Sequence, residues 1–258
     1  MRPVLVDLGP LQVNSWGVMA ALAFLAAAVV AGAELQRRGH SRADAWPLTI
    51  AGAIGGLIGA KLYFLVEHPD RIADAGAWLS GEGFTWYGGV LGGTAAVLLV
   101  ASRRGLTPAV TAASLVPALA LGYAIGRIGC QLAGDGTYGI ASDLPWAMSY
   151  PDGIVPTSQR VHPTPAYETL AGLLIFAALW QLRARLSAWR LVGVYLLLSG
   201  IERFAVEFAR RNDEVLAGLT QPQLWALAGA FAGLALLGTA RRDRAAPRTA
   251  PAGLARGS

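Results

Sequence analysis

Long apolar stretches dominate the sequence, and short polar segments separate them. A helix that crosses a bilayer needs about 20 mainly apolar residues. By this criterion we expect an all-α, polytopic membrane protein with about seven transmembrane helices. The predicted spans are 15–35, 49–66, 86–102, 108–126, 165–183, 189–209 and 221–239.

The predicted spans form one transmembrane domain, residues 1–240, because no boundary of a soluble domain interrupts them. Residues 241–258 are basic and rich in proline and alanine, a composition typical of a disordered tail. The first residues lack a charged segment running into an apolar one, so we expect no cleavable signal peptide.

Arginines gather after the first, third, fifth and seventh spans, which places them in alternate loops. Cytoplasmic loops of membrane proteins are enriched in Lys and Arg. We therefore predict that the N-terminus lies outside and the C-terminus is cytoplasmic. The arginines concerned are Arg37, Arg38, Arg42, Arg103, Arg104, Arg183, Arg185, Arg190, Arg241, Arg242 and Arg244.

Composition supports the membrane assignment and narrows the partners. Only 14% of the residues are charged and 54% are hydrophobic, whereas soluble domains are about 25% charged. The net charge of +5 comes from the loop arginines, which makes nucleic acid an unexpected partner. The single cysteine, Cys130, excludes an internal disulfide.

Residues 124–139, AIGRIGCQLAGDGTYG, interrupt the apolar pattern with Arg127, Cys130, Gln131 and Asp135. The predicted topology places this stretch at the outer face, after the fourth span. Flanking glycines permit close approach of the backbone to an anionic ligand. Two alternatives stay open: Arg127 snorkels to the lipid headgroups, or the glycines form a tight re-entrant turn without a ligand.

Other polar residues fall in the outer halves of the predicted spans, where they mark a functional site by default. Arg203 and Glu207 are four residues apart and share a helix face. Either they neutralise each other for insertion, or Glu207 holds Arg203 ready to grip a phosphate. Arg210 falls on a neighbouring face and fits an interfacial position. Lys61 fits either snorkelling or phosphate binding.

The segment HPTPAYE, residues 162–168, brings His162, Tyr167 and Glu168 to the start of the fifth span. Prolines are favoured in the first turn of a helix, and Tyr167 with Glu168 could tie this helix to Arg127 or Arg203. A lone histidine there is more often structural than catalytic. The spacing indicates no metal site, and no cofactor is expected. An interfacial aromatic belt is the simplest interpretation of Trp16, Trp86 and Trp146.

Together these motifs resemble the prolipoprotein diacylglyceryl transferase family from about residue 8 to 240. GRIGCQLAGDGTYG resembles the family signature around GR-x-GNF-x-NGE-x-x-G. HPTPAYE is similar to HPSQLYE, and RFAVEFAR to R-x-x-VEFFR. LGPLQVNSWG resembles G-P-x-x-x-x-WYG, and GFTWYGG stands in the place of S-x-HGG.

The resemblance implies an enzyme of the bacterial cytoplasmic (inner) membrane. It implies transfer of the diacylglyceryl group of phosphatidylglycerol, a membrane lipid, to the lipobox cysteine in a prolipoprotein signal peptide. Arg127 and Arg203 would hold the phosphate, Glu207 and Asp135 would position them, and Gly134 and Gly139 would shape the loop. Further residues expected at the substrate site are Lys61, Trp16, Cys130, His162, Tyr167 and Glu168.

Four residues depart from the family pattern. Tyr87 replaces the histidine proposed to activate the thiol, Cys130 replaces an asparagine, and Trp16 a tyrosine; Asp135 with an extra residue replaces a glutamate. A tyrosine, with a normal pKa near 10, needs nearby arginines to act as a base; alternatively Tyr87 orients the headgroup. Cys130 is either a packing residue or, beside Arg127, itself an acceptor of a lipid or acyl group.

These departures favour two rival functions. One is a divergent paralogue that modifies another acceptor, and the other is a membrane protein that binds or transports phospholipid without catalysis. Arg127, Arg203 and Glu207 predict phosphate binding in every case.

Overall fold

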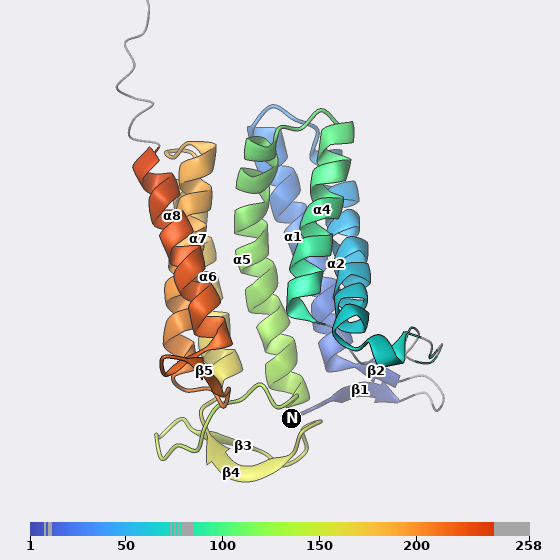
Figure 1. Cartoon of the computed structure of the whole chain (residues 1–258), viewed down its shortest axis with the longest axis vertical. Helices are drawn as coiled ribbons and strands as arrows, with labels where there is room; N and C mark the ends of the chain where they lie inside the picture. The colour runs from blue at the N-terminus through green and yellow to red at the C-terminus, as the bar shows by residue number, and fades with distance from the viewer. Residues whose placement is uncertain are drawn as a thin grey trace, which may run out of the picture.

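The computed structural model describes residues 1–7, 9, 12–72, 74, 76, 78 and 85–239 and is mostly helical (Figure 1). Its long helices lie roughly parallel to one another and follow the apolar stretches of the sequence. They are α1 (Ser15–Arg37), α2 (Ala45–Glu67), α4 (Trp86–Arg103), α5 (Pro108–Ala133), α6 (Thr164–Leu182), α7 (Ala188–Glu207) and α8 (Gln221–Thr239). Two short 3-10 helices, Arg42–Asp44 and Pro69–Arg71, flank α2.

Among the described residues, five helical segments are long and apolar enough to cross a membrane. These are Ser15–Arg37, Arg42–Glu67, Pro108–Ala133, Thr164–Leu182 and Gln221–Thr239, and Tyr87–Arg103 is a shorter apolar helix. Large apolar side chains cover their outward faces: Leu57, Leu174 and Phe231 are 61%, 64% and 67% exposed. Such faces suit lipid rather than water, so the protein is a helical membrane protein.

In the part of the chain that the structure describes, six short strands form three antiparallel hairpins, which the all-α prediction did not include. The strands are β1 (Val4–Asp7) with β2 (Gln12–Asn14), β3 (Met148–Tyr150) with β4 (Thr157–Val161), and β5 (Glu214–Leu216) with β6 (Leu219–Thr220). All three lie at one end of the helices, called here the hairpin end (Figure 1). They escape the apolar pattern because each strand has only two to five residues and lies in a connecting segment.

Close pairs of helices build the bundle. The pair α2 and α4 meets through glycines on both helices, and the backbones touch where Gly59 faces Gly88 and Gly92. Small residues at such an interface allow close packing in a membrane. The helix α5 packs against α1 and also contacts α6 and α7, so it connects the two halves of the bundle (Figure 1).

The helix α5 is longer than predicted and changes the interpretation of residues 124–139. It continues to Ala133 and ends where Gly134 takes a left-handed conformation, with φ of +59°. Glycine adopts this conformation without steric penalty and commonly ends a helix. Arg127, Cys130 and Gln131 therefore lie on the helix, and the loop begins only at Gly134.

The loop arginines described by the structure gather at the end opposite the hairpins, called here the turn end (residues 38–44, 104–107 and 183–187) (Figure 1). One buried carboxylate organises several of them. Glu34 pairs with Arg37 at 2.8 Å, with Arg183 at 3.0 Å and with Arg38 at 3.6 Å. The predicted gathering of these arginines at one end is confirmed, whereas the predicted tail, residues 241–258, lies outside the described residues.

Candidate functional site

Glu168, in the first turns of α6, is the centre of a polar cluster near the hairpin end. Its side chain is fully buried. One carboxylate oxygen, Oε1, lies 2.8 Å from Nη2 of Arg127 on α5 and 3.1 Å from Nη1 of Arg203 on α7. The same oxygen accepts a hydrogen bond of 2.9 Å from the hydroxyl of Tyr123. A single carboxylate thus joins α5, α6 and α7.

Glu207 supplies a second buried carboxylate at the end of α7. Its Oε2 lies 2.6 Å from Nη2 of Arg203, so the pairing predicted from their spacing is present. Its other oxygen accepts hydrogen bonds from Asn212 and, at 3.0 Å, from the hydroxyl of Thr220. The Arg203 guanidinium therefore contacts two carboxylates: Nη1 pairs with Glu168 and Nη2 with Glu207. These two contacts fix its position.

Arg210 belongs to the same cluster, although its position in the sequence indicated an interfacial residue. It follows the end of α7, and its Nη1 lies 3.4 Å from Oε2 of Glu168 and donates to the Thr137 carbonyl at 3.2 Å. Burial lowers the pKa of Arg210, and the guanidinium groups of Arg203 and Arg127 lower it further against the opposing effect of Glu168. Positive charge is therefore crowded here, as an anion-binding site requires.

We call this set the Glu168 cluster. It places three guanidinium groups against two carboxylates, and Arg127 and Arg203 keep 17% and 24% of their side chains exposed. Arginine presents paired N–H donors that match phosphate geometry. The members of the cluster are Tyr123, Arg127, Glu168, Arg203, Glu207 and Arg210.

The glycine-rich loop lies directly against this cluster. The amide of Gly139 donates to the His162 carbonyl at 2.8 Å, and a Cβ atom on Gly139 would clash with the Ala209 carbonyl. The Thr164 hydroxyl donates to the Thr137 carbonyl at 2.7 Å. Only glycine fits at position 139, because backbone from two other segments passes so close to it.

Asp135 and Cys130 lie at the edge of the cluster. Oδ1 of Asp135 accepts hydrogen bonds from the Thr137 amide and hydroxyl, at 3.2 Å and 2.7 Å, which shapes the loop. The sulfur of Cys130 is buried 3.9 Å from Nη1 of Arg127. In the described structure Glu168, rather than Asp135, contacts Arg127, so the suggestion that Asp135 positions an arginine stays a prediction.

His162, Tyr167 and Trp146 form a second polar group beside the cluster. The Tyr167 hydroxyl accepts from the indole N–H of Trp146 at 2.8 Å and lies 3.3 Å from Nδ1 of His162. Tyr167 thus ties the β3–β4 segment to α6. The sequence suggested that Tyr167 with Glu168 could tie this helix to Arg127 or Arg203. Glu168 makes that tie and contacts both arginines.

The remaining predicted residues come from the other half of the bundle. Tyr87, in the first turn of α4, lies with its ring centroid 5.4 Å from that of Trp225 on α8 and within electrostatic range of Arg203. Lys61 is buried on α2, with Nζ 6.0 Å from the Phe64 ring. Trp16 is the second residue of α1. A Cβ atom added at Gly129, the neighbour of Cys130, would touch Trp16.

Sequence reasoning did not select three residues that the structure places at or near the cluster. Tyr123 donates to Glu168, Arg210 pairs with it, and Glu202 buries one carboxylate oxygen without a hydrogen-bond partner among the described residues. The spacing of Tyr123 and Arg127, four apart on one helix, was an available signal. Arg210 also carried a local signal, because it lies three residues after Glu207 and its Nε is 3.7 Å from Oε2 of that residue. Its contact with Glu168 depends instead on the turn of the chain after α7.

The fold and the cluster define a class: a helical membrane protein with a buried, arginine-rich site that suits a phosphate group. Comparison with known proteins then identifies the family. The sequence profile of prolipoprotein diacylglyceryl transferase matches residues 3–239. The chain belongs to the prolipoprotein diacylglyceryl transferase family.

Individual relatives agree over most of the chain. A phosphatidylglycerol–prolipoprotein diacylglyceryl transferase from Clostridium tetani is 33% identical over 214 residues, which is 81% of this chain and 86% of the relative. The protein of the same name from Chromohalobacter salexigens is 32% identical and covers 93% of both chains. The similarity therefore extends over the helices that build the Glu168 cluster.

Proposed function

We propose that this protein transfers the diacylglyceryl group of phosphatidylglycerol to the lipobox cysteine of prolipoproteins. Membership of the family supports this activity. The observation that locates this activity in the molecule is the Glu168 cluster, where arginines from two helices converge on buried carboxylates. The reaction needs cations at the phosphate, and Arg127 and Arg203 supply partly exposed guanidinium groups.

The proposed topology has seven spans, an outer N-terminus and a cytoplasmic C-terminus, in the bacterial inner membrane. The arginines at the turn end support this orientation, because cytoplasmic loops are enriched in such residues. With it, the Glu168 cluster and the hairpins lie toward the outer face. Prolipoprotein substrates present their signal peptide from that side, and phosphatidylglycerol enters from the bilayer.

The proposed chemistry is a nucleophilic displacement at carbon. The cysteine sulfur forms a bond to the terminal glycerol carbon of the diacylglyceryl group, and the bond from that carbon to the phosphate oxygen breaks. The thiol proton passes to a base, and glycerol-1-phosphate leaves with the electron pair. Negative charge grows on the leaving phosphate, so Arg127 and Arg203 stabilise the transition state more than the ground state.

The first test is complementation of a bacterial strain depleted of its own transferase. The wild-type chain should restore lipidation. Replacing Arg127 or Arg203 with glutamine should lower the rate of lipidation by about a hundredfold or more, since each removes a charge from the leaving phosphate. Lipidated and unlipidated prolipoprotein are separated by gel mobility, and the initial rates are compared.

Arg185→Gln is the matched control, because it removes an arginine at the turn end, far from the cluster (Figure 1). It should rescue as well as the wild type. Failure of well-expressed wild-type protein to rescue would contradict the proposed acceptor. Full rescue by Arg127→Gln would contradict the proposed phosphate site.

Tyr87 is the proposed group near the attacking thiol. It stands where the family pattern has a histidine, and it lies within electrostatic range of Arg203. Replacing Tyr87 with phenylalanine keeps the ring against Trp225 and removes only the hydroxyl. We expect the lipidation rate to fall by about 10²–10⁴, the range of acid–base catalysis.

Comparing kcat with KM for Tyr87→Phe separates two roles. A fall in kcat alone fits proton transfer, and a rise in KM alone fits orientation of the headgroup. Unchanged activity would exclude both. Tyr63→Phe, which alters the neighbouring tyrosine at a ring distance of 6.5 Å, is the control.

A second candidate function rests on the residues that replace family residues, Tyr87 and Cys130. A divergent paralogue would bind the same phospholipid and modify a different acceptor. In that case purified protein would release glycerol-1-phosphate only with an acceptor other than a lipobox peptide. A protein that only binds or transports phospholipid would release none with any acceptor.

A further inference from the structure

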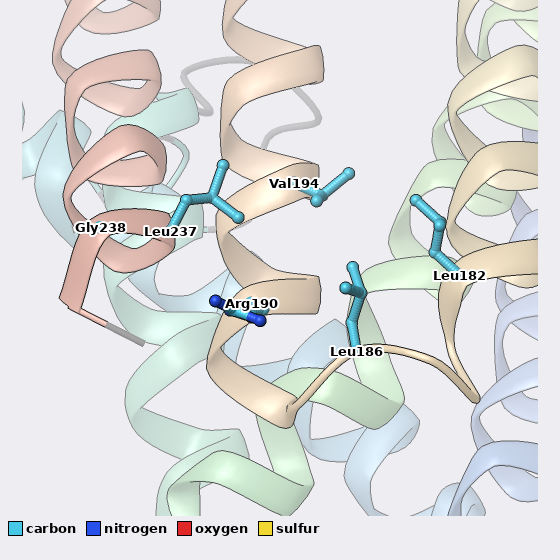
Figure 2. Close-up of a pocket in the computed structure, with 6 residues that line it drawn as sticks. All are labelled: Leu182, Leu186, Arg190, Val194, Leu237 and Gly238. Atoms are coloured by element: carbon cyan, nitrogen blue, oxygen red, sulfur yellow. The ribbon is translucent and has the colours of Figure 1, made fainter. Parts of the chain in front are cut away.

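A groove at the turn end, remote from the Glu168 cluster, has the composition of a lipid site. It has a volume of about 570 Å³ and lies between the end of α6, the start of α7 and the end of α8 (Figure 2). This volume falls within the range of small-molecule sites. The lining residues are Leu182, Leu186, Arg190, Val194, Leu237 and Gly238.

Arg190 is the one charged residue in this lining, and its environment differs from that of its neighbours. The other arginines that are partly buried at this end have an acidic partner: Arg38 and Arg183 both pair with Glu34. Among the described residues, none forms an ion pair or hydrogen bond with the guanidinium of Arg190. A partly buried cation beside aliphatic side chains lacks the charge that would balance it.

The groove therefore presents two complementary surfaces to one ligand. Leucine and valine side chains from three helical segments surround an apolar space, and the Arg190 guanidinium lies at its side (Figure 2). An amphiphile with a hydrocarbon chain and an anionic head would bury the chain and pair the charge. Trp189 is 45% exposed next to Arg190, as expected of a residue at the level of the headgroups.

We propose that this groove binds an anionic phospholipid from the leaflet that adjoins the turn end. One acyl chain packs against Leu182, Leu186 and Leu237, and the phosphate pairs with Arg190. The surrounding arginines raise the local concentration of anionic lipid. This site is separate from the Glu168 cluster, because α6 and α7 extend over their full lengths between the two ends.

The test is photo-crosslinking of the full chain in phosphatidylcholine nanodiscs. Each nanodisc sample contains a small fraction of one probe lipid, either phosphatidylglycerol or phosphatidylcholine. Both probes carry a diazirine on one acyl chain. Labelled peptides are mapped by mass spectrometry. We expect the phosphatidylglycerol probe to label peptides containing Leu182–Val194 and Leu237 more strongly than the phosphatidylcholine probe does. Inorganic phosphate added in excess should not compete, because the acyl chain provides much of the binding.

Variants test each half of the proposed site. Arg190→Gln should lower groove labelling by phosphatidylglycerol about tenfold, as expected for loss of one charge-assisted hydrogen bond, and Arg190→Lys should retain most of it. Arg185→Gln, which lies outside the lining, is the matched control. Val194→Trp should block the space and reduce labelling by both probes.

Labelling of peptides around Arg127 and Arg203 is recorded in the same samples and should not change in any groove variant. Labelling at these peptides reports on the proposed catalytic site, so a failure of the groove proposal can be distinguished from a failure of the proposed function. The proposal is overturned if both probes label the groove equally, or if Arg190→Gln labels as strongly as the wild type. Labelling confined to the peptides around Arg127 and Arg203 would overturn it as well.

Discussion

Replacing Glu168 with glutamine should lower both the activity and the stability of the protein. Glu168 contacts three arginines and one tyrosine from a fully buried position. Removing one partner of a buried ion pair lowers the free energy of unfolding by about 3–5 kcal/mol, because it leaves an uncompensated buried charge. We expect an apparent unfolding midpoint lowered by about 10 °C and a lipidation rate lowered by at least about a hundredfold.

Two effects are combined in that result, and a matched variant separates them. Glu34 is also a buried carboxylate contacted by three arginines, but it lies at the turn end. Glu34→Gln should lower the unfolding midpoint by a similar amount and leave kcat of the folded protein unchanged. The measurements are thermal unfolding in detergent and initial rates per folded molecule.

Equal losses of specific activity in Glu34→Gln and Glu168→Gln would contradict a positioning role for Glu168. Phosphatidylglycerol dependence gives a further check. If Glu168 orients Arg127 and Arg203, its glutamine variant should show a changed KM as well as a changed kcat. A purely structural role would change neither in the molecules that remain folded.

The apolar pattern of the sequence predicted the long helices well, for a physical reason. Lipid leaves no alternative partner for backbone N–H and C=O groups, so a long apolar stretch becomes a helix. Each predicted span corresponds to one long helix, although within the described ranges only five helical segments meet the length and hydropathy expected of a span. Helix α7 is the informative exception, because Glu202, Arg203 and Glu207 make it too polar.

The site was only partly predictable. The four-residue spacing of Arg203 and Glu207 indicated a pair, and the structure contains it at 2.6 Å. The sequence suggested that Glu168 could reach Arg127 or Arg203, but not that it contacts three arginines at once. These partners lie 41, 35 and 42 residues away in the sequence, on other segments. Such convergence depends on how helices pack, which composition and periodicity do not specify.

The end of α5 shows the opposite problem, because local signals were present but ambiguous. Glycines at 126 and 129 and the charge of Arg127 suggested that the helix stops. The helix continues because Gly129 packs tightly on α1, where a Cβ atom would meet Met19 at 3.0 Å. Glycine here serves close helix packing, whereas the left-handed Gly134 ends the helix.

The second large effect is expected at the α2–α4 interface, where Gly59 should not tolerate a side chain. A Cβ atom at Gly59 would clash with the Gly88 carbonyl oxygen and lie 2.8 Å from Cα of Gly92. Neither backbone can rotate away as a side chain would. Gly59→Leu must therefore separate the two helices, and overpacking of this kind lowers stability by about 1–3 kcal/mol or more.

We expect Gly59→Leu to lower the unfolding midpoint by roughly 10 °C and Gly59→Ala to have a smaller effect in the same direction. The activity of the folded fraction should fall too, because Gly88 follows Tyr87 directly, and moving the start of α4 moves that hydroxyl away from Arg203.

Gly17→Leu is the control, since a Cβ atom there meets nothing within 4 Å. If Gly59→Leu and Gly17→Leu unfold at the same temperature, the backbone contact between α2 and α4 does not hold this half of the bundle together. If Gly59→Leu is destabilised but keeps full specific activity, the contact does not position Tyr87.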